Sequence, residues 1–520
     1  MHKALARPAV ADLKRKSVVG GFAAVSAQGA KFVVQTATMM VLARLLSPQD
    51  FGLQGMVVVV TGFLALFRDA GLGMATIQRL EVTHEQTSTL FWINVAVGAM
   101  LAALCVALAP LVVRFYHEPR LYWVVVVSGL AFLFNGLALQ HGALLGRGMR
   151  FVTQAKIDVL SLAVSSAVGV VMGMLGCRYW SLVGMAVTSP LVMMVLLWSA
   201  VRWIPGPPRR GAGIRSMLHF GGLATCNSFV VFLAWNAEKL LLGRFWGADA
   251  LGLYGRGFAL VTLPVQQLNA AIGSVAFPAL SRIQHDVKRL ARSFLRFFGL
   301  LFSLTIPSTI CCALFAEEMV RIVLGPKWME AAPIVALLGP VALVFAVANP
   351  LSWLVMSTGR MGRALAISTA TTPFVIVGIL LGLSHGPKGV ALAYSLALSL
   401  LLIPIAAWSK LGTGITWTDL WRVMKPPFVS GLLAGAAGLL VKFTLGGRLP
   451  SILYLVVGLA VVLGIYAWGL LILMGQKHVY MDVLSQLLPR SKIGQERMPD
   501  QPSDRSESYK PGGVAEKIPC

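Results

Sequence analysis

Apolar runs of about 20 residues recur along nearly the whole chain, separated by short polar breaks. Each run is long enough to cross a hydrocarbon core of roughly 30 Å as a helix, whereas a membrane β-barrel needs alternating strands of about ten residues. Hydrophobic residues make up 57% of the chain and charged residues 12%, and the mean hydropathy is +0.77. These values exclude a water-soluble globular protein and predict an all-α polytopic membrane protein with about 14 transmembrane helices.

The predicted spans are 20–42, 51–73, 88–112, 121–140, 155–176, 180–201, 216–242, 249–276, 294–316, 331–354, 362–383, 388–409, 427–445 and 451–474.

Lys and Arg concentrate in alternate loops, beginning with the N-terminal segment that holds Lys14, Arg15 and Lys16. Because basic residues accumulate on the cytoplasmic side, both termini are predicted to be cytoplasmic, which requires an even number of spans. The net charge of +24 then reflects topology and attraction to anionic membrane lipids, and no nucleic acid is expected as a partner.

Two stretches that lie 200 residues apart have similar sequences, VLARLLSPQDFGLQGMVV from Val41 and LLLGRFWGADALGLYGRG from Leu241. At this constant offset, Arg44, Gly52, Leu53 and Gly55 fall on Arg244, Gly252, Leu253 and Gly255. Later parts also match, because GRGMR at 146–150 resembles GRMGR at 359–363 with an offset of 213. The sequence therefore predicts an internal repeat whose second copy is about ten residues longer.

Six spans in each copy enter the membrane in the same direction, which predicts two parallel six-helix lobes around a central cleft. The predicted segments are a basic cytoplasmic N-terminal segment (1–19), an N-lobe (20–202), a cytoplasmic linker (203–213), a C-lobe (214–410), a cytoplasmic loop (411–426), two extra C-terminal helices (427–474) and a disordered cytoplasmic tail (475–520). Rocking of two such lobes can expose the cleft to either side of the membrane in turn, which predicts a transporter.

Six motifs in order also resemble those of a known family. LKRKSVVGGF, VLARLLSPQDFGL, FRDAGLGMATIQR, FWIN, VAFPALSRIQ and VLGPKWMEAAP begin at Leu13, Val41, Phe67, Phe91, Val275 and Val323. They are similar to the signatures of bacterial polysaccharide-type flippases, of the colanic-acid or O-antigen kind, in the multidrug/oligosaccharidyl-lipid/polysaccharide (MOP) exporter superfamily. The resemblance runs from about Leu13 to Gly475.

The resemblance implies a transporter without cofactors rather than an enzyme. Its substrate would be an undecaprenyl-pyrophosphate-linked oligosaccharide, flipped from the cytoplasmic to the outer leaflet of the inner membrane by alternating access. A polysaccharide polymerase or export complex would be a further partner. Two alternatives stay open, a cation-coupled multidrug antiporter of the same superfamily and a membrane-embedded glycan polymerase or ligase. The chain has no P-loop motif, so ATP hydrolysis is not expected as its direct drive.

Flipping requires cations in the cleft for the pyrophosphate, and polar residues inside spans are the candidates. Lys31 lies in the middle of the first span, where an exposed ammonium costs about 2.5–3.5 kcal/mol. Gln28 and Gln35 share its helical face. We expect these three residues to line the substrate cavity, and the alternative is that Lys31 makes a structural hydrogen bond between helices or snorkels to the interface.

Four arginines, Arg147, Arg150, Arg360 and Arg363, would ring the cytoplasmic mouth of the cleft, unless they are ordinary positive-inside anchors. The candidates for ion coupling are Asp69, Asp158, Glu238 and Lys239, because they are charged residues near membrane depth. Alternatively, Asp69 pairs with Arg68, and Glu238 pairs locally with Lys239. The cysteines show no metal-ligand spacing, so no metal site is expected.

Overall fold

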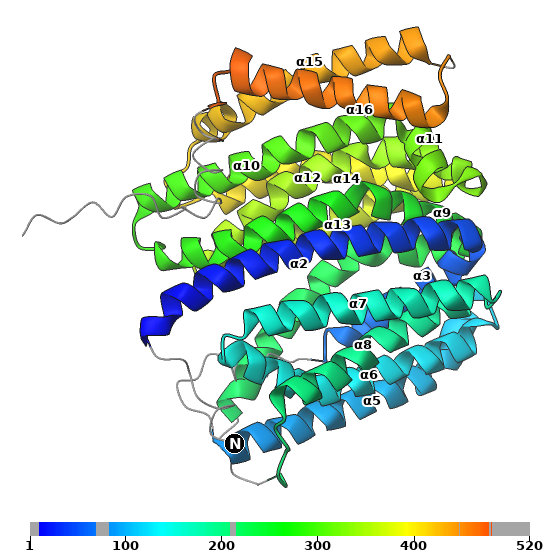
Figure 1. Cartoon of the computed structure of the whole chain (residues 1–520), viewed down its shortest axis with the longest axis vertical. Helices are drawn as coiled ribbons and strands as arrows, with labels where there is room; N and C mark the ends of the chain where they lie inside the picture. The colour runs from blue at the N-terminus through cyan, green and yellow to red at the C-terminus, as the bar shows by residue number, and fades with distance from the viewer. Residues whose placement is uncertain (1–9, 69–82, 209–214, 447, 478–479, 481–520) are drawn as a thin grey trace, which may run out of the picture. The chain divides into compact units, whose positions relative to one another are not determined.

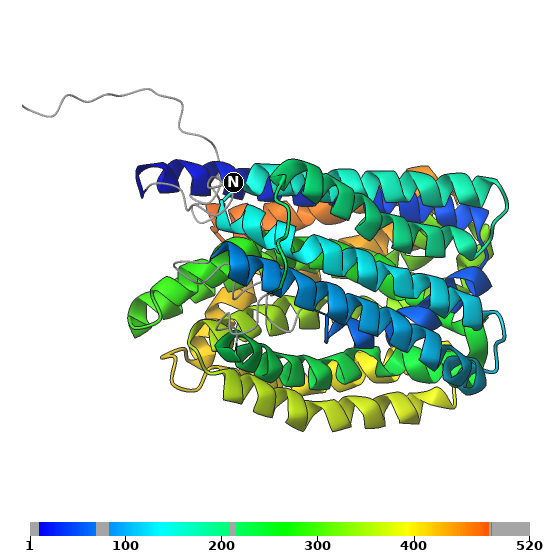
Figure 2. The same ribbon diagram turned by 90° about the horizontal axis from the view of Figure 1, so that it is seen from below.

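The computed structural model describes residues 10–68, 83–208, 215–446, 448–477 and 480, and in this part every regular element is a helix (Figure 1). The long helices are α2 (Val10–Leu45), α3 (Pro48–Ala65), α5 (His84–Tyr116), α6 (Leu121–Arg147), α7 (Phe151–Met174), α8 (Trp180–Val201), α9 (Arg215–Arg282), α10 (Val287–Leu314), α12 (Ala332–Ser357), α13 (Met361–Leu383), α14 (Gly386–Ser409), α15 (Trp417–Leu445) and α16 (Ser451–Trp468). They lie side by side in both views (Figures 1 and 2), as expected of helices that cross a membrane together.

The longest helix, α9, contains two spans. Gly247 interrupts it with a φ of 78° and a ψ of −172°, a left-handed conformation that glycine adopts without steric cost. The two arms of α9, residues 215–246 and 248–282, are therefore separate membrane crossings. Among the described residues, 11 helices pass a test of length and hydropathy for a span, with α9 counted once. α2, α3 and the second arm of α9 are further long helices of the described part, and the expected all-α polytopic fold is confirmed.

Several helices extend beyond the predicted spans. α2 begins at Val10, and α15 begins at Trp417 inside the segment predicted as a cytoplasmic loop. The start of α15 is fixed by a capping box, in which the Thr416 hydroxyl accepts from the Asp419 N–H at 3.1 Å and the Asp419 carboxylate accepts from the Thr416 N–H at 3.0 Å. Hydropathy reports only the apolar part of a helix, so it misses polar turns outside the membrane.

Contacts between helices follow the two copies of the repeat. In the first copy, α5 packs on α6, α7 on α8 and α2 on α7. In the second copy, α10 packs on α12, α12 on α14 and α13 on α14. The two copies meet where α3 and α2 contact α9. The helices α15 and α16 stand beside α10 at one edge of the bundle (Figure 1), and the Tyr466 hydroxyl donates to the carbonyl of Ser303 at 2.7 Å.

The turns α6–α7 and α12–α13 have the same backbone structure. The N–H of Arg150 donates to the carbonyl of Leu145, and the N–H of Arg360 donates to the carbonyl of Val355, at 3.1 and 3.2 Å. Donor and acceptor in the second turn each lie 210 residues after their counterparts in the first. The residues that precede the two arginines, Met149 and Gly359, have the same offset, and both have a left-handed backbone. The predicted offset of 213 is therefore wrong for this turn. Arg360 corresponds to Arg150, and neither Arg147 nor Arg363 has a basic counterpart in the other copy.

The additional residues of the second copy lie between α10 and α12, where α11 (Ala316–Met319), η1 (Val320–Leu324) and η2 (Pro326–Ala331) replace the short link 117–120 of the first copy. Trp328 in η2 is fully buried, and its Nε1–H donates to the carbonyl of Ala43 in α2 at 2.7 Å. Its ring meets the edge of Phe51 at a centroid distance of 5.3 Å. This segment therefore fastens the end of α2 to the second copy.

The two occurrences of the repeated motif, one in each copy, pack against each other where α3 crosses the second arm of α9. A Cβ on Gly52 would lie 1.7 Å from the carbonyl oxygen of Ala248, and a Cβ on Gly252 would lie 1.9 Å from the carbonyl oxygen of Pro48. Pro48 and Ala248 are equivalent at the offset of 200, and so are Gly52 and Gly252. An approximate twofold axis therefore exchanges the two halves of this contact. The recurrence of these glycines in the sequence thus has a steric cause, since only glycine allows the two backbones to approach so closely.

Candidate substrate and ion-coupling site

Lys31 and Asp158, predicted separately for two different roles, form an ion pair. The Nζ atom of Lys31 in α2 lies 2.9 Å from Oδ2 of Asp158 in α7, across 127 residues of sequence. Their side chains are 23% and 27% exposed. Lys31 is about 20 Å along the helix from Leu45, at a rise of about 1.5 Å per residue, which places the pair deep within a membrane core of roughly 30 Å. A charged, partly accessible pair therefore lies inside the first copy of the repeat.

The neighbouring glutamines connect the two copies. The Nε2 of Gln267, in the second arm of α9, donates to Oε1 of Gln35 in α2 at 2.8 Å. Gln28, one turn before Lys31, is half-buried. Gln35 lies one turn after Lys31 on the same face of α2, so the ion pair of the first copy and the hydrogen bond between the copies are neighbours.

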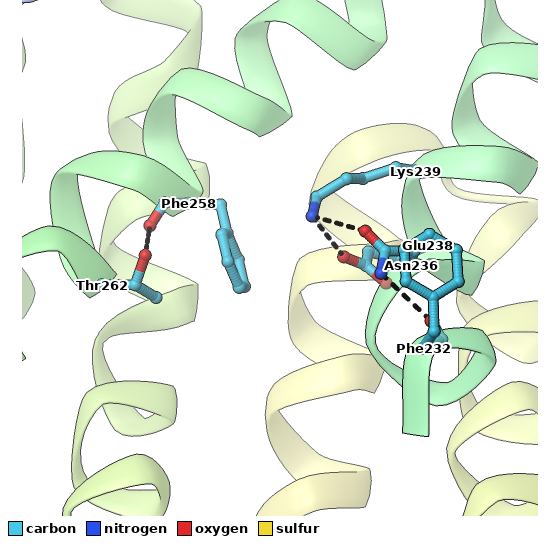
Figure 3. A network of polar contacts seen from close by, with 6 residues as sticks. All are labelled: Phe232, Asn236, Glu238, Lys239, Phe258 and Thr262. Carbon is cyan, nitrogen blue, oxygen red and sulfur yellow. Dashed lines mark hydrogen bonds and ion pairs between the residues drawn. The ribbon is translucent and has the colours of Figure 1, made fainter. Parts of the chain in front are cut away.

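Glu238 and Lys239 form a second charged site, in the first arm of α9 (Figure 3). Glu238 is fully buried, and its Oε1 lies 3.8 Å from Nζ of Lys239. The same ammonium donates to Oδ1 of Asn236 at 3.1 Å and lies 5.4 Å from the ring centroid of Phe258, which belongs to the second arm. Neither carboxylate oxygen of Glu238 accepts a hydrogen bond from the described residues. The expected local pair is present, but the carboxylate keeps its acceptor capacity.

Aromatic side chains surround this second site. Tyr254 and Tyr394 are buried, and both lie within electrostatic range of the Glu238 carboxylate. Phe258 packs between Tyr394 and Phe345, at centroid distances of 6.3 and 6.4 Å. The hydroxyl of Tyr254 has no hydrogen-bond partner in the described part of the chain. The buried Glu238 carboxylate therefore shares an apolar environment with the Tyr254 hydroxyl, a donor for which the described residues provide no acceptor.

The charged residues break the symmetry of the repeat. At the offsets that the structure establishes for these helices, Val231 and Ser368 occupy the places of Lys31 and Asp158. In the other direction, Thr38 and Met39 occupy the places of Glu238 and Lys239. Each copy thus carries one charged pair at membrane depth without a charged counterpart. A scaffold of two similar halves holds two chemically different sites.

The arginines predicted at the mouth bind backbone carbonyls at helix ends. Nη1 of Arg150 donates to the carbonyl of Ala200 at 3.0 Å. Arg360 and Arg363 both donate to the carbonyl of Leu411, and Arg360 also reaches the carbonyl of Gly412 at 3.1 Å. Cations near the ends of α8 and α14 also interact favourably with the helix dipoles.

Of the remaining predicted residues, Arg147 is buried at the end of α6. Asp69 lies outside the described residues. The structure thus brings Lys31 together with Asp158, and Glu238 together with Lys239. The arginines Arg150, Arg360 and Arg363 lie instead at the ends of the α7–α8 and α13–α14 hairpins.

The prediction from sequence did not include Arg256, in the second arm of α9. Its guanidinium lies over the ring of Phe51 in α3, 4.6 Å from the centroid, and its Nε–H has no acceptor among the described residues. This is a cation–π contact between the two copies. Arg256 is nine residues beyond Gly247, about 13 Å along the arm. The sequence does mark this residue, because LGLYGRGFAL places a lone arginine in an apolar run. The repeat does not, because the first copy has an apolar residue, Met56, at the matching position.

Comparison with known proteins agrees with this architecture. Residues 41–333 match a family model described as "Polysaccharide biosynthesis protein". The teichuronic acid biosynthesis protein TuaB of Bacillus subtilis is 28% identical over 312 residues, which cover 58% of this chain and 63% of TuaB, less than two thirds of its length. The lipopolysaccharide biosynthesis protein WzxC of Escherichia coli is 27% identical, covering 69% of this chain and 73% of WzxC. The succinoglycan biosynthesis transport protein ExoT of Rhizobium meliloti is 25% identical over 89% of this chain and 93% of ExoT.

Solved structures give the fold. The lipid II flippase MurJ in an inward closed conformation superimposes with a TM-score of 0.70, at 13% identity, over 88% of this chain and 98% of MurJ. An inward-facing multidrug resistance MATE family transporter of the MOP superfamily gives a TM-score of 0.59, at 13% identity, over 75% of this chain and 96% of that transporter. The predicted resemblance is confirmed: the chain is a multi-pass membrane protein of the polysaccharide biosynthesis protein family, and it shares the fold of these MurJ and MATE structures.

Proposed function

We propose that this protein flips an undecaprenyl-pyrophosphate-linked oligosaccharide from the cytoplasmic to the outer leaflet of the bacterial inner membrane, for synthesis of an exopolysaccharide or an O-antigen-type polysaccharide. Both termini would be cytoplasmic, and a polymerase or export complex would take over the product. The observation that carries the proposal is Lys31, a cation about a quarter exposed at membrane depth. Relatives named for teichuronic acid, lipopolysaccharide and succinoglycan biosynthesis support a glycan substrate.

The chemistry of the substrate assigns tasks to these side chains. A pyrophosphate needs cations, and the Lys31 ammonium provides a compact charge for it. Gln28, Gln35 and Gln267 would exchange hydrogen bonds with glycan hydroxyl groups, since amides both donate and accept. Arg256 adds a second cation where the copies meet, with one Nε–H that has no acceptor in the described chain. The polyprenyl tail would remain in lipid, beside α15 and α16.

Transport would proceed by rocking of the two copies. The hydrogen bond between Gln35 and Gln267 crosses from one copy to the other, so such a motion must break it. Lys31 and Asp158 both belong to the first copy, so the motion itself does not require their ion pair to break. Arg150, Arg360 and Arg363 would mainly hold the helical hairpins, with attraction of anionic lipid as a consequence of their charge.

The second charged site would couple transport to an ion. Ionisable groups within a membrane most often serve ion pathways or relays. Glu238 offers two carboxylate oxygens that accept no hydrogen bond from described residues, next to the single ammonium of Lys239. Binding of a proton or a small cation at Glu238 would change the net charge of this pair and thereby the packing of α9. Asp69 would be a further coupling residue.

A second candidate function is cation-coupled antiport of drugs. The observation that favours it is the buried Glu238 carboxylate among Tyr254, Phe258 and Tyr394, since acidic and aromatic groups together suit cationic aromatic compounds. Lys31 would disfavour such cargo, and α15 and α16 are not needed for it. We set aside the glycan polymerase or ligase alternative, because the relative ExoT, which matches 89% of the chain, is named as a transport protein.

Complementation tests the proposal. The chain is expressed in flippase-null strains that make different known glycans, and lipid-linked repeat units are measured on the cytoplasmic side. We expect their accumulation to fall, and polymer export to return, in at least one strain. Accumulation in every strain, together with a gain of drug resistance, would contradict the flippase and favour the antiporter.

A further inference from the structure

We propose that Asp158 is a built-in competitor of the substrate: its carboxylate occupies the anion site on Lys31 in the empty transporter and gives way to the pyrophosphate. The inference rests on the proposed function, because it takes Lys31 as the phosphate site. It assigns to Asp158 a positioning role in binding and release, in place of the ion-coupling role predicted from its sequence position.

The geometry fits a replaceable partner. Nζ of Lys31 and Oδ2 of Asp158 are 2.9 Å apart, a short charge-assisted hydrogen bond. Both side chains remain about a quarter exposed, so another anion can reach the ammonium. The pair joins α2 to α7 within one copy of the repeat, and it therefore does not lock the two copies together. Its exchange with a ligand need not await the rocking motion.

Electrostatics explains why such a competitor helps. A lone ammonium at this depth is costly, and the carboxylate neutralises it while no substrate is bound. A pyrophosphate carries more negative charge than a carboxylate and presents several oxygens, so it can displace Asp158. After the copies rock, the return of the carboxylate to Lys31 promotes departure of the product. Without Asp158 the anion would bind more tightly and leave more slowly.

The second copy supports a specialised role for the pair. Its residues at the matching positions are Val231 and Ser368, which cannot form an ion pair, although α9 and α13 are in contact. If the ion pair only held the two helices together, we would expect a similar pair in both copies. Ser368 also indicates a neutral residue that this position tolerates, which makes Asp158→Ser a useful variant.

The test measures binding of inorganic pyrophosphate to the full chain in nanodiscs of neutral lipid, by calorimetry. The variants are Asp158→Asn, Lys31→Gln and the double variant, with Lys156→Gln as the matched control. Lys156 lies two residues before Asp158 on another face of α7 and is exposed. Asp158→Asn should bind about tenfold more tightly than the wild type, equivalent to about 1.4 kcal/mol. The double variant should lose this gain, and Lys156→Gln should resemble the wild type.

The outcomes separate this inference from the proposed function. Equal affinities of the wild type and Asp158→Asn, both lost with Lys31→Gln, would overturn the competitor role and leave Lys31 as the phosphate site. Binding that survives Lys31→Gln would overturn both the competitor role and the phosphate site. Weaker or absent binding to Asp158→Asn would overturn the competitor role alone. If Asp158→Asn does not insert into the membrane, Asp158→Ser is used in the same titration. In transport, loss of the carboxylate should lower both the apparent KM and the maximal rate, a split that a merely structural role does not produce.

Discussion

Gly52 and Gly252 lie at equivalent positions of the repeat, and each faces a backbone carbonyl of the other copy, that of Ala248 and of Pro48. The contact joins the first turns of two helices that begin on the same side of the membrane. Because backbone meets backbone, no side-chain rearrangement can make room there. The two halves of the transporter are therefore held at this crossing at a distance that glycine alone permits.

Gly52→Ala and Gly252→Ala should each weaken the fold. The new methyl carbons would lie 1.7 and 1.9 Å from carbonyl oxygens, so the helices must move apart. Overpacking of this kind typically costs about 1–3 kcal/mol and sometimes more. Thermal stability of detergent-solubilised protein and abundance in membranes are the measurements. Gly255→Ala is the matched control, because a Cβ there meets nothing within 4 Å. Equal losses in all three variants would contradict the crossing as the cause.

The spans were predictable from sequence and the paired side chains were not, for a physical reason. Hydropathy is a local property, so each apolar run predicts its own helix. The recurrence of Gly52 at Gly252 also signalled a shared contact, although not which backbone atoms meet. Lys31 and Asp158 are 127 residues apart, and local patterns contain no information on that distance. The sequence therefore predicts a separate role for each. The repeat does not point to Arg256 either, because its first-copy counterpart is Met56.

Arg150→Gln should reduce stability more than transport. The substitution removes the hydrogen bond from Nη1 to the carbonyl of Ala200 at the end of α8. The side chain is exposed, so we expect a loss of about 1 kcal/mol, less than the roughly 1.5–3 kcal/mol of buried hydrogen bonds to charged groups. Thermal stability and transport per folded molecule are measured together. A fall in normalised transport with unchanged stability would instead favour a substrate-contacting role at the mouth.

Reporter fusions test the topology. Fusions after Gly213 and Gly475 should report a cytoplasmic location, and one after Gly247 should report the outside, because basic residues concentrate in the cytoplasmic loops. Gly247 separates the two arms of α9, so we expect a reporter there to lie on the side opposite to the start of α9 at Arg215. An outside location for the first two reporters would refute the parallel repeat with cytoplasmic termini.

Glu238→Gln should uncouple transport from its driving ion. The amide keeps the size of the side chain, but it cannot take up a proton or hold a cation by charge. Lys239 retains its hydrogen bond to Asn236, so the loss of its ionic neighbour should be tolerated. Accumulation against a gradient in vesicles should be lost, while downhill movement and pyrophosphate binding persist. Glu317→Gln, at an exposed carboxylate, serves as the control. Undiminished uphill transport by Glu238→Gln would remove this residue from the coupling mechanism.

We propose that the chain moves a lipid-linked glycan across the membrane with Lys31 as its phosphate site. The most direct test of this proposal is reconstitution into liposomes, with the undecaprenyl-pyrophosphate-linked oligosaccharide in one leaflet and a membrane-impermeant reagent that modifies exposed sugars on the other side. The wild type should make the glycan accessible. Lys31→Arg should retain part of this rate because a cation remains, whereas Lys31→Gln and Lys31→Ala should stop it at normal reconstituted abundance. Wild-type transport by Lys31→Ala would contradict the phosphate site, and no protein-dependent transport by the wild type would contradict the flippase itself.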